Sequence, residues 1–202
     1  MDQSVQDNFV FLCGSCAGEA VYSHSARSQN FYVLPLLVRR LSGTADTINV
    51  TVRETMLGML ENVPRLCVTG EVRTFNNRSG EWPRLVVSVF ARTLAPADEA
   101  DENLVCLRGT LCKPPNLRTT PMGRDICDLI LAINRRYGRS DYLPCICWGV
   151  KAREAALWEV GTRLSLEGRF QSRRYSKLTE SGLEERTAYE ISAAQIEPLT
   201  DF

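Results

Sequence analysis

The two halves of this 202-residue chain carry the same succession of apolar runs, glycines and charges. Four pairs of positions match at a nearly constant separation of 95–98 residues. These pairs are Gly14 with Gly109, Arg40 with Arg136, Asp46 with Asp141, and residues 66–70 with residues 164–168. One period that fits four times indicates two copies of one structural unit. The chain is therefore expected to fold as a tandem repeat.

The joint between the two copies is residues 95–103. This stretch is acidic, lacks aromatic residues and follows an apolar strand, which is typical of a solvated linker. Because it is short, we expect the two domains to be docked closely. The predicted domains are residues 8–94 and residues 104–199.

Composition and charge exclude several classes of protein. Lys and Arg total 24, as do Asp and Glu, so the formal charge is zero, and 44% of the residues are hydrophobic, as in an ordinary globular protein. No apolar run approaches the ~20 residues of a membrane span. The polar, acidic start is unlike a secretory signal, so we expect a cytoplasmic protein. Any nucleic-acid binding must come from a local arrangement of charge, which is −3 over residues 1–103 and +3 over residues 104–202.

Most of the cysteines are expected to be small apolar core residues in a reducing cytosol, not a disulfide framework. Cys13 and Cys16 have zinc-knuckle spacing, but no second such pair follows, and whether they bind a metal stays open. We predict no metal and no cofactor. The full set is Cys13, Cys16, Cys67, Cys106, Cys112, Cys127, Cys145 and Cys147.

Each copy shows the order strand, strand, strand, helix, strand, strand. In the second copy the strands are expected near residues 104–112, 125–136, 141–148, 163–175 and 186–197, with a helix over 150–160 that ends at Gly161. In the first copy, residues 53–62 occupy the position of the helix. Five strands with a helix between the third and fourth is the order of an OB-fold, a small Greek-key barrel. We predict an all-β protein of two tandem OB-folds with short helices.

Period-2 alternation separates the two faces of the strands in the second copy. On the third strand, Leu143, Cys145 and Cys147 are predicted to face the core, and Tyr142, Ile146 and Trp148 to face outward. Pro144 predicts a bulge or an edge position. On the fourth strand, the predicted core residues are Leu164, Leu166 and Phe170. The predicted outward set is Ser165, Glu167, Arg169, Gln171, Arg173 and Tyr175.

Aromatic side chains interleaved with arginines on one barrel face form a platform for unpaired bases. Every base has a π-face, so stacking tolerates any sequence, while guanidinium groups follow the phosphates. Duplex DNA hides its base faces, so such a surface selects single strands. Tyr137 lies beside Arg135, Arg136 and Arg139 on the second hairpin and extends the pattern. The bland alternative is that these aromatics cover the barrel or form a subunit interface.

Residues 105–199 resemble the bacterial single-stranded DNA-binding protein family. The matching motifs, which come in the family's order and spacing, are Gly109 to Leu111 with Pro115, then 117–123, 131–137, 141–149 and 166–175. The resemblance implies that Tyr137, Tyr142, Trp148 and Tyr175 stack on bases and that Arg173 and Arg174 contact phosphates. The complete predicted binding set is Tyr137, Tyr142, Trp148, Tyr175, Arg135, Arg136, Arg139, Arg169, Arg173, Arg174 and Lys177.

The first copy departs from the family pattern. At the four stacking positions it carries Leu41, Thr47, Arg53 and Asn77. We expect weaker, auxiliary binding there, or a barrel that serves mainly in subunit contact. The auxiliary candidates are Arg39, Arg40, Arg53, Arg73, Phe75, Arg78 and Trp82.

The resemblance also bears on partners. The family assembles four OB domains, so two in one chain imply a homodimer that binds single-stranded DNA in replication, recombination and repair. Family members end in a long linker and an acidic tip that recruits other proteins. Here Asp201 and Phe202 resemble only the tip, so recruitment through such a tail is not expected.

Catalysis is not expected, because no constellation of acid, base, nucleophile or metal ligand is evident. His24, the single histidine, is read as a surface residue in a polar loop. Two alternatives to DNA binding remain. One is an RNA-binding OB module, since stacking surfaces tolerate ribose, and the other is an OB-fold protein-interaction scaffold.

Overall fold

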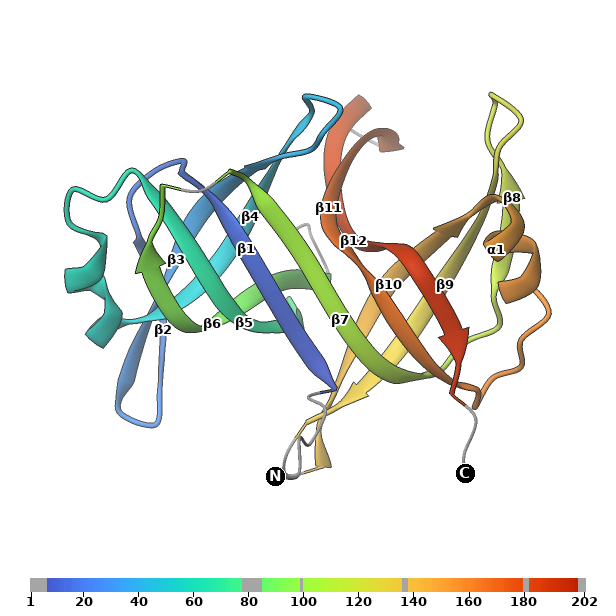
Figure 1. Ribbon diagram of the computed structural model, residues 1–202, viewed down its shortest axis with the longest axis horizontal. Coiled ribbons are helices and arrows are strands. Elements are labelled where there is room, and N and C mark those ends of the chain that lie inside the picture. Colours follow the sequence, from blue (N-terminus) through green and yellow to red (C-terminus); the bar gives the residue numbers. More distant parts are fainter. Residues whose placement is uncertain (1–6, 78–84, 99, 136–137, 180–181, 200–202) are drawn as a thin grey trace.

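Alternating apolar and polar residues along the strands produce two β-barrels, which lie side by side in the computed structural model (Figure 1). The structure describes residues 7–77, 85–98, 100–135, 138–179 and 182–199. None of the helices among these residues is long and apolar enough to cross a membrane.

The N-terminal barrel is closed by strand β1, which pairs antiparallel with both β3 and β5. Strand β4 pairs with β3 and, through a short parallel contact, with β6. A hairpin strand, β2, extends β3 at the edge. The elements are β1 (Asn8–Cys16), β2 (Val21–Ala26), β3 (Gln29–Arg39), β4 (Ala45–Arg53), the 3₁₀ helix η1 (Glu54–Leu60), β5 (Arg65–Asn76) and β6 (Leu85–Pro96).

The C-terminal barrel repeats these pairings with β7 in the place of β1. Its elements are β7 (Glu102–Leu111), β8 (Asn116–Thr119), β9 (Asp125–Asn134), β10 (Ser140–Trp148), α1 (Gly149–Ala155), β11 (Arg163–Thr179) and β12 (Gly182–Pro198). The predicted tandem OB-fold is confirmed. Strands β2 and β8 were not predicted, and both predicted helices are shorter in the structure. Residues 156–160 lie outside α1, before Gly161 at a φ of +100°.

A glycine in each barrel allows two strands to approach closely at a bulge. A Cβ at Gly70 would collide with the carbonyl oxygen of Phe90, and one at Gly168 with that of Ser192. The pairing register shifts at both glycines. The glycine that ends the 66–70 and 164–168 repeat is therefore a requirement of the barrel bend.

The core of the C-terminal barrel follows the predicted alternation, with two corrections. Leu143, Cys145 and Cys147 are buried, as are Leu164, Leu166 and Phe170. Ile146 and Gln171 were predicted to face outward into solvent, but only 3% and 6% of their surfaces are exposed. Ile146 is flanked by both β9 and β12, and Gln171 donates a hydrogen bond to Glu190. Of the two alternatives for Pro144, a bulge is wrong, because its pairing with β9 continues without a register shift. The edge position fits, because the short pairing of β10 with β12 begins only at Cys145.

The two barrels are joined about a local two-fold axis. Strand β1 pairs antiparallel with β7, and Val10 lies opposite Val105, its own counterpart 95 residues later (Figure 1). Strand β6 reaches Pro96 and β7 begins at Glu102, so strands occupy both ends of the predicted 95–103 linker. The carboxylate of Asp101 within that linker accepts hydrogen bonds from the Arg39 backbone N–H and from Arg65, both at 2.7 Å.

Two buried aspartates, Asp46 and Asp141, complete the joint between the barrels. We call each aspartate, together with its hydrogen-bond partners, a clasp: the Asp46 clasp and the Asp141 clasp. Asp46 accepts hydrogen bonds from the backbone N–H of Ser172 (2.7 Å), its hydroxyl (2.9 Å) and Arg40. Arg40 also donates to the Ser172 carbonyl. The Asp46 clasp thus ties β4 of the N-terminal barrel to β11 of the C-terminal barrel.

In the Asp141 clasp, Asp141 accepts from the N–H and hydroxyl of Thr74 and from Arg135. Arg135 donates to the Thr74 carbonyl at 2.9 Å, just as Arg40 donates to that of Ser172. The counterpart of Arg40 is therefore Arg135 and not Arg136, which was the sequence-based match.

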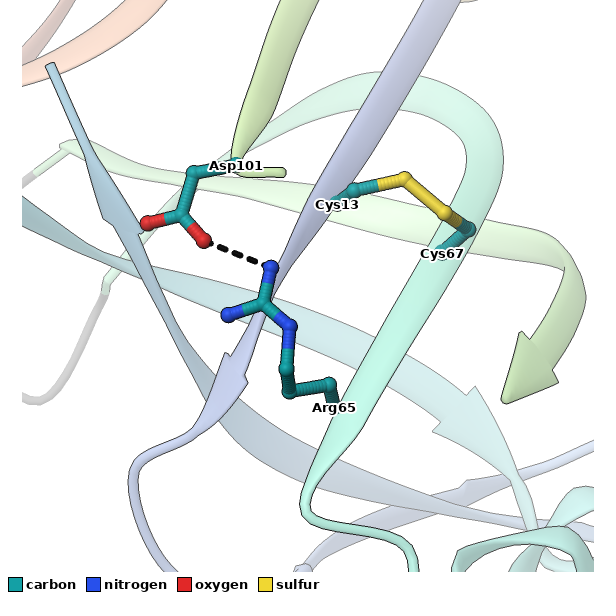
Figure 2. The surroundings of a disulfide bond; sticks show 4 residues. All are labelled: Cys13, Arg65, Cys67 and Asp101. Atoms are coloured by element: carbon teal, nitrogen blue, oxygen red, sulfur yellow. Dashed lines mark hydrogen bonds and ion pairs between the residues drawn. A yellow bond between two sulfur atoms is a disulfide. The ribbon is translucent and has the colours of Figure 1, made fainter. Parts of the chain in front are cut away.

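The expectation that the cysteines are reduced, most of them as small core residues, is wrong for one pair. Cys13 and Cys67 lie opposite each other on β1 and β5 and form a disulfide (Figure 2). Cys13 is therefore not available as a zinc-knuckle ligand. The same figure shows Arg65, which forms an ion pair with Asp101 beside the disulfide.

Reducing this disulfide is expected to lower the free energy of unfolding by about 2–4 kcal/mol, because the bond closes a long loop and restricts the unfolded chain. Its cysteines are separated by 54 residues in sequence. Urea unfolding followed by circular dichroism, with and without reductant, measures the change. The stability of Cys13→Ala should not respond to reductant. An equally indifferent wild type would show that the bond contributes nothing.

Candidate nucleic-acid interface

The register of the strands places part of the predicted set, namely Tyr142, Trp148, Tyr175, Arg169, Arg173 and Lys177, on one outer face of the C-terminal barrel. Tyr142 and Trp148 alternate with the core residues of β10 and are 53% and 41% exposed. Ile146, which shares their side of β10, pairs with Ser192 of β12, and Ser192 pairs with Arg169 of β11. Because paired residues point to the same side of a sheet, this face continues across three strands. We call it the C-terminal face.

Strand β11 extends the C-terminal face beyond the barrel. Gln171, Arg173 and Tyr175 follow Arg169 on the same side of the strand, at every second residue. The Cζ atom of Arg173 lies 5.2 Å from the centre of the Tyr175 ring. Lys177, also exposed, continues the same side of the strand. Aromatic and cationic groups therefore alternate along the long β11–β12 hairpin.

The Trp148 ring is held by a hydrogen bond. Its Nε1–H donates to the Ser192 hydroxyl at 3.3 Å. This contact fixes one edge of the indole against β12 and limits the rotation of an otherwise exposed ring. A ring that is already ordered loses less conformational entropy when a base stacks on it.

Acidic groups balance part of the positive charge on the C-terminal face. Glu190, on β12, lies 3.8 Å from Arg173 and accepts a hydrogen bond from Gln171. Arg118, on β8, forms a two-pronged contact with Asp128, at 2.6 and 2.9 Å. The hydrogen bonds that Arg118 donates to the Asp128 carboxylate raise the pKa of Arg118 above its usual value. Arg118 was not among the predicted residues, although it lies in the 117–123 motif, because β8 was not foreseen.

The remaining predicted residues of the second copy are dispersed. Arg139 is exposed beyond β9, and Arg174 is exposed on the side of the hairpin opposite Arg173. The guanidinium of Arg135 is engaged in the Asp141 clasp and lies at the joint between the barrels. Arg136 and Tyr137 lie outside the described residues.

The auxiliary candidates of the first copy do not form a single cluster. Arg39, at the end of β3, forms an ion pair with Asp101 of the predicted linker, and Arg40 belongs to the Asp46 clasp. Arg73 forms ion pairs with Asp141 and Glu71. Arg53 and Phe75 line one groove on the N-terminal barrel, and Arg73 lines it with them. Arg78 and Trp82 lie outside the described residues.

The described residues contain no group of three or more His, Cys, Asp or Glu side chains that could hold a metal ion. Burial raises the pKa of Cys147 to about 12 and that of Cys145 further, so both thiols are protonated at neutral pH. A protonated thiol is neither a metal ligand nor a nucleophile. The imidazole of His24 is exposed and stacks on Phe31.

Comparison with known proteins points to one family. The signature of the Single-strand binding protein family matches residues 102–199. Single-stranded DNA-binding protein B of Bacillus subtilis (strain 168) is 35% identical over 80 residues, which cover 36% of this chain and 71% of that protein. Single-stranded DNA-binding protein 2 of Listeria innocua serovar 6a is also 35% identical over 80 residues, covering 36% of this chain and 50% of that protein. The chain spans about half the length of most curated relatives it matches.

Solved structures extend the likeness to both barrels. The wild-type single-stranded DNA binding protein from Thermus aquaticus superposes with a TM-score of 0.77 at 22% identity, covering 96% of this chain and 94% of that chain. A deletion mutant of the same protein gives a TM-score of 0.76 at 23% identity, covering 96% of each chain. The two barrels and their tandem arrangement are therefore a fold already seen in a solved structure.

Proposed function

Because this chain belongs to the Single-strand binding protein family, we propose that it binds single-stranded DNA, without sequence preference, on its C-terminal face. The observation that carries the proposal is the exposure of Tyr142 and Trp148 on the same side of β10, flanked on β11 by Arg169, Arg173 and Tyr175. No catalytic step is part of this function.

The proposed binding follows from the chemistry of these side chains. Each exposed ring offers a flat apolar surface on which any base can stack, a contact that contributes ~1–3 kcal/mol per base. The arginines neutralise phosphates and release the counterions that the strand had condensed, which makes affinity depend on salt. Paired bases in a duplex present no free π-face to the rings, so single strands are preferred.

Titration of the chain with oligo-dT, followed by tryptophan fluorescence, tests the proposal. Stacking on Trp148 should quench its emission, and the affinity should fall steeply as the salt concentration rises. An oligo-rU of the same length is the matched comparison. Tighter binding of the RNA would favour an RNA-binding module, and absence of binding to either oligonucleotide would favour a protein scaffold.

We also propose that two chains associate, so that four barrels share one strand in replication, recombination and repair in the cytoplasm. The local two-fold axis supports this arrangement, because one chain already has the symmetry of a dimer of barrels. A mass measurement in solution, with and without oligo-dT, tests it. The expected particle has twice the 22.7 kDa of one chain.

A further inference from the structure

We propose that a groove on the outer face of the N-terminal barrel receives the DNA strand as it leaves the C-terminal face and stacks its bases on His24 and Phe75. This inference rests on the proposed function of the C-terminal face. The groove has a volume of about 1090 Å³. That volume lies above the ~300–1,000 Å³ typical of a pocket for one drug-sized ligand. The groove therefore has room for more than one nucleotide.

A row of three aromatic rings forms one wall of the groove. The His24 imidazole stacks on Phe31, with ring centres 5.0 Å apart and planes at 18°. Phe31 in turn contacts Phe90, with ring centres 5.9 Å apart. Phe31 is nearly buried, whereas His24 is exposed and lines the groove, so Phe31 covers only one face of the imidazole. That face is a ready stacking surface for a base.

Phe75 supplies a second exposed ring in the same groove. It is on β5, where its side alternates with the core residues, and 56% of its surface is exposed. The Phe75 ring has no polar group that could hydrogen-bond to water. Contact with a base would remove its apolar surface from water, which is favourable.

The aromatic surface of the N-terminal barrel has been rebuilt on a neighbouring strand. In the C-terminal barrel the ring belongs to Trp148 of β10, and Ser192 of β12 is its hydrogen-bond partner. In the N-terminal barrel the matching positions are Arg53 of β4 and Phe90 of β6. The Cζ atom of Arg53 lies 4.9 Å from the centre of the Phe90 ring. Cation and aromatic ring are both present, but the ring has moved from β4 to β6.

The charges of the groove suit a phosphate backbone. Arg92 lies 5.3 Å from the Phe90 ring centre and donates two hydrogen bonds to Glu71, at 3.0 and 2.7 Å. Arg53 has the Phe90 ring, not a carboxylate, as its described partner. A phosphate can therefore approach Arg53 without displacing an ion pair.

The groove adjoins β10 of the C-terminal barrel at the joint between the barrels. Asn134 and Arg135, at the end of β9, line the groove together with Thr74 of β5. The Thr74 hydroxyl accepts a hydrogen bond of 3.1 Å from the backbone N–H of Tyr142. A strand stacked on Tyr142 is thus already at the mouth of the groove.

The test uses fluorescence anisotropy of labelled oligo-dT with the full chain. One OB-fold covers about 4–16 nucleotides, so an oligonucleotide of about 8 fits the C-terminal face alone, whereas one of about 30 can cross the joint. The variants are His24→Ala and Phe75→Ala, both at exposed positions. Each is expected to weaken binding of the long oligonucleotide by about 5- to 100-fold, the loss of one stacked base. Binding of the short one should change far less.

Tyr22→Ala is the matched control. Tyr22 is an exposed aromatic on the same strand as His24, but it pairs with Tyr32 and so points to the side opposite Phe31. The control should bind both oligonucleotides like the wild type. The groove proposal is overturned if both groove variants match the wild type on the long oligonucleotide, or if Tyr22→Ala loses as much as they do. A wild type that binds neither oligonucleotide would refute the proposed function itself.

Discussion

Replacing Asp141 with alanine is expected to lower the free energy of unfolding by about 3–5 kcal/mol, the usual effect of removing one partner of a buried ion pair. The Asp141 carboxylate is fully buried and accepts hydrogen bonds from the Thr74 backbone N–H (2.6 Å), the Thr74 hydroxyl (3.2 Å), Arg73 (2.9 Å) and Arg135. Its removal leaves two half-buried guanidinium groups beside each other and a backbone donor without an acceptor.

Urea unfolding at neutral pH measures this loss of stability, and two further variants serve as comparisons. Asp128→Ala removes an exposed carboxylate paired with Arg118, and the expected loss is only ~0–1 kcal/mol. Asp46→Ala breaks the symmetry-related clasp, and its loss should be similar to that of Asp141→Ala. A loss for Asp141→Ala no larger than that for Asp128→Ala would show that the clasp does not stabilise the joint.

The same clasps predict how stability depends on pH. Burial disfavours the charged form of Asp46 and Asp141, but hydrogen bonds from arginine, backbone N–H and hydroxyl groups outweigh it and lower the pKa of both carboxyls. A lowered folded-state pKa adds stability above the unfolded-state value of about 3.9, and this stability is lost as the pH falls further. The free energy of unfolding should therefore decline below about pH 4, and less steeply in Asp141→Asn.

Local sequence pattern was enough to predict the architecture. The alternation of Leu143, Cys145 and Cys147 with Tyr142 and Trp148 depends only on the period of a strand. Tertiary packing overrode it only at Ile146, which the neighbouring strands bury. The repeat that ends at Gly70 and Gly168 marks the barrel bend because no residue with a Cβ fits there. These are constraints within one strand or between two neighbours.

Contacts between segments that are distant in the sequence could not be predicted from local sequence pattern. The disulfide joins Cys13 and Cys67 because β1 and β5 pair in one particular register, which no local pattern specifies. Arginines predicted to bind phosphate, Arg40 and Arg135, are instead engaged with aspartates at the barrel joint. A basic residue near a binding motif has the same appearance in sequence whether its partner is a phosphate or a buried carboxylate.

The candidate surface of the first barrel shows a further limit. An alignment of the two copies at a fixed offset compares each strand only with its own counterpart. Arg53 occupies the position of Trp148 in that alignment, so it indicated a lost stacking site. The ring on the neighbouring strand, Phe90, is invisible to that comparison. Only the arrangement of β4 beside β6 shows that the two residues share one surface.

Replacing both Trp148 and Tyr175 with alanine is expected to weaken binding of oligo-dT by roughly 30- to 25,000-fold, the effect of losing two base stacks at ~1–3 kcal/mol each. Both rings are on the C-terminal face and outside the core, so the free energy of unfolding should change little. Anisotropy of a labelled oligonucleotide is the suitable measurement, because the substitution removes the tryptophan that would report by fluorescence.

Two single substitutions separate stacking from simple apolar contact. Trp148→Phe keeps a flat ring and should retain most of the affinity, whereas Trp148→Leu keeps apolar surface without a π-face and should lose nearly as much as alanine. Leu157→Ala, at an exposed apolar residue just after α1, is the control and should bind like the wild type. If Trp148→Leu binds as well as Trp148→Phe, the indole serves as a hydrophobic cover and bases do not stack on it. If the double variant also binds like the wild type, the strand follows a path that avoids the C-terminal face.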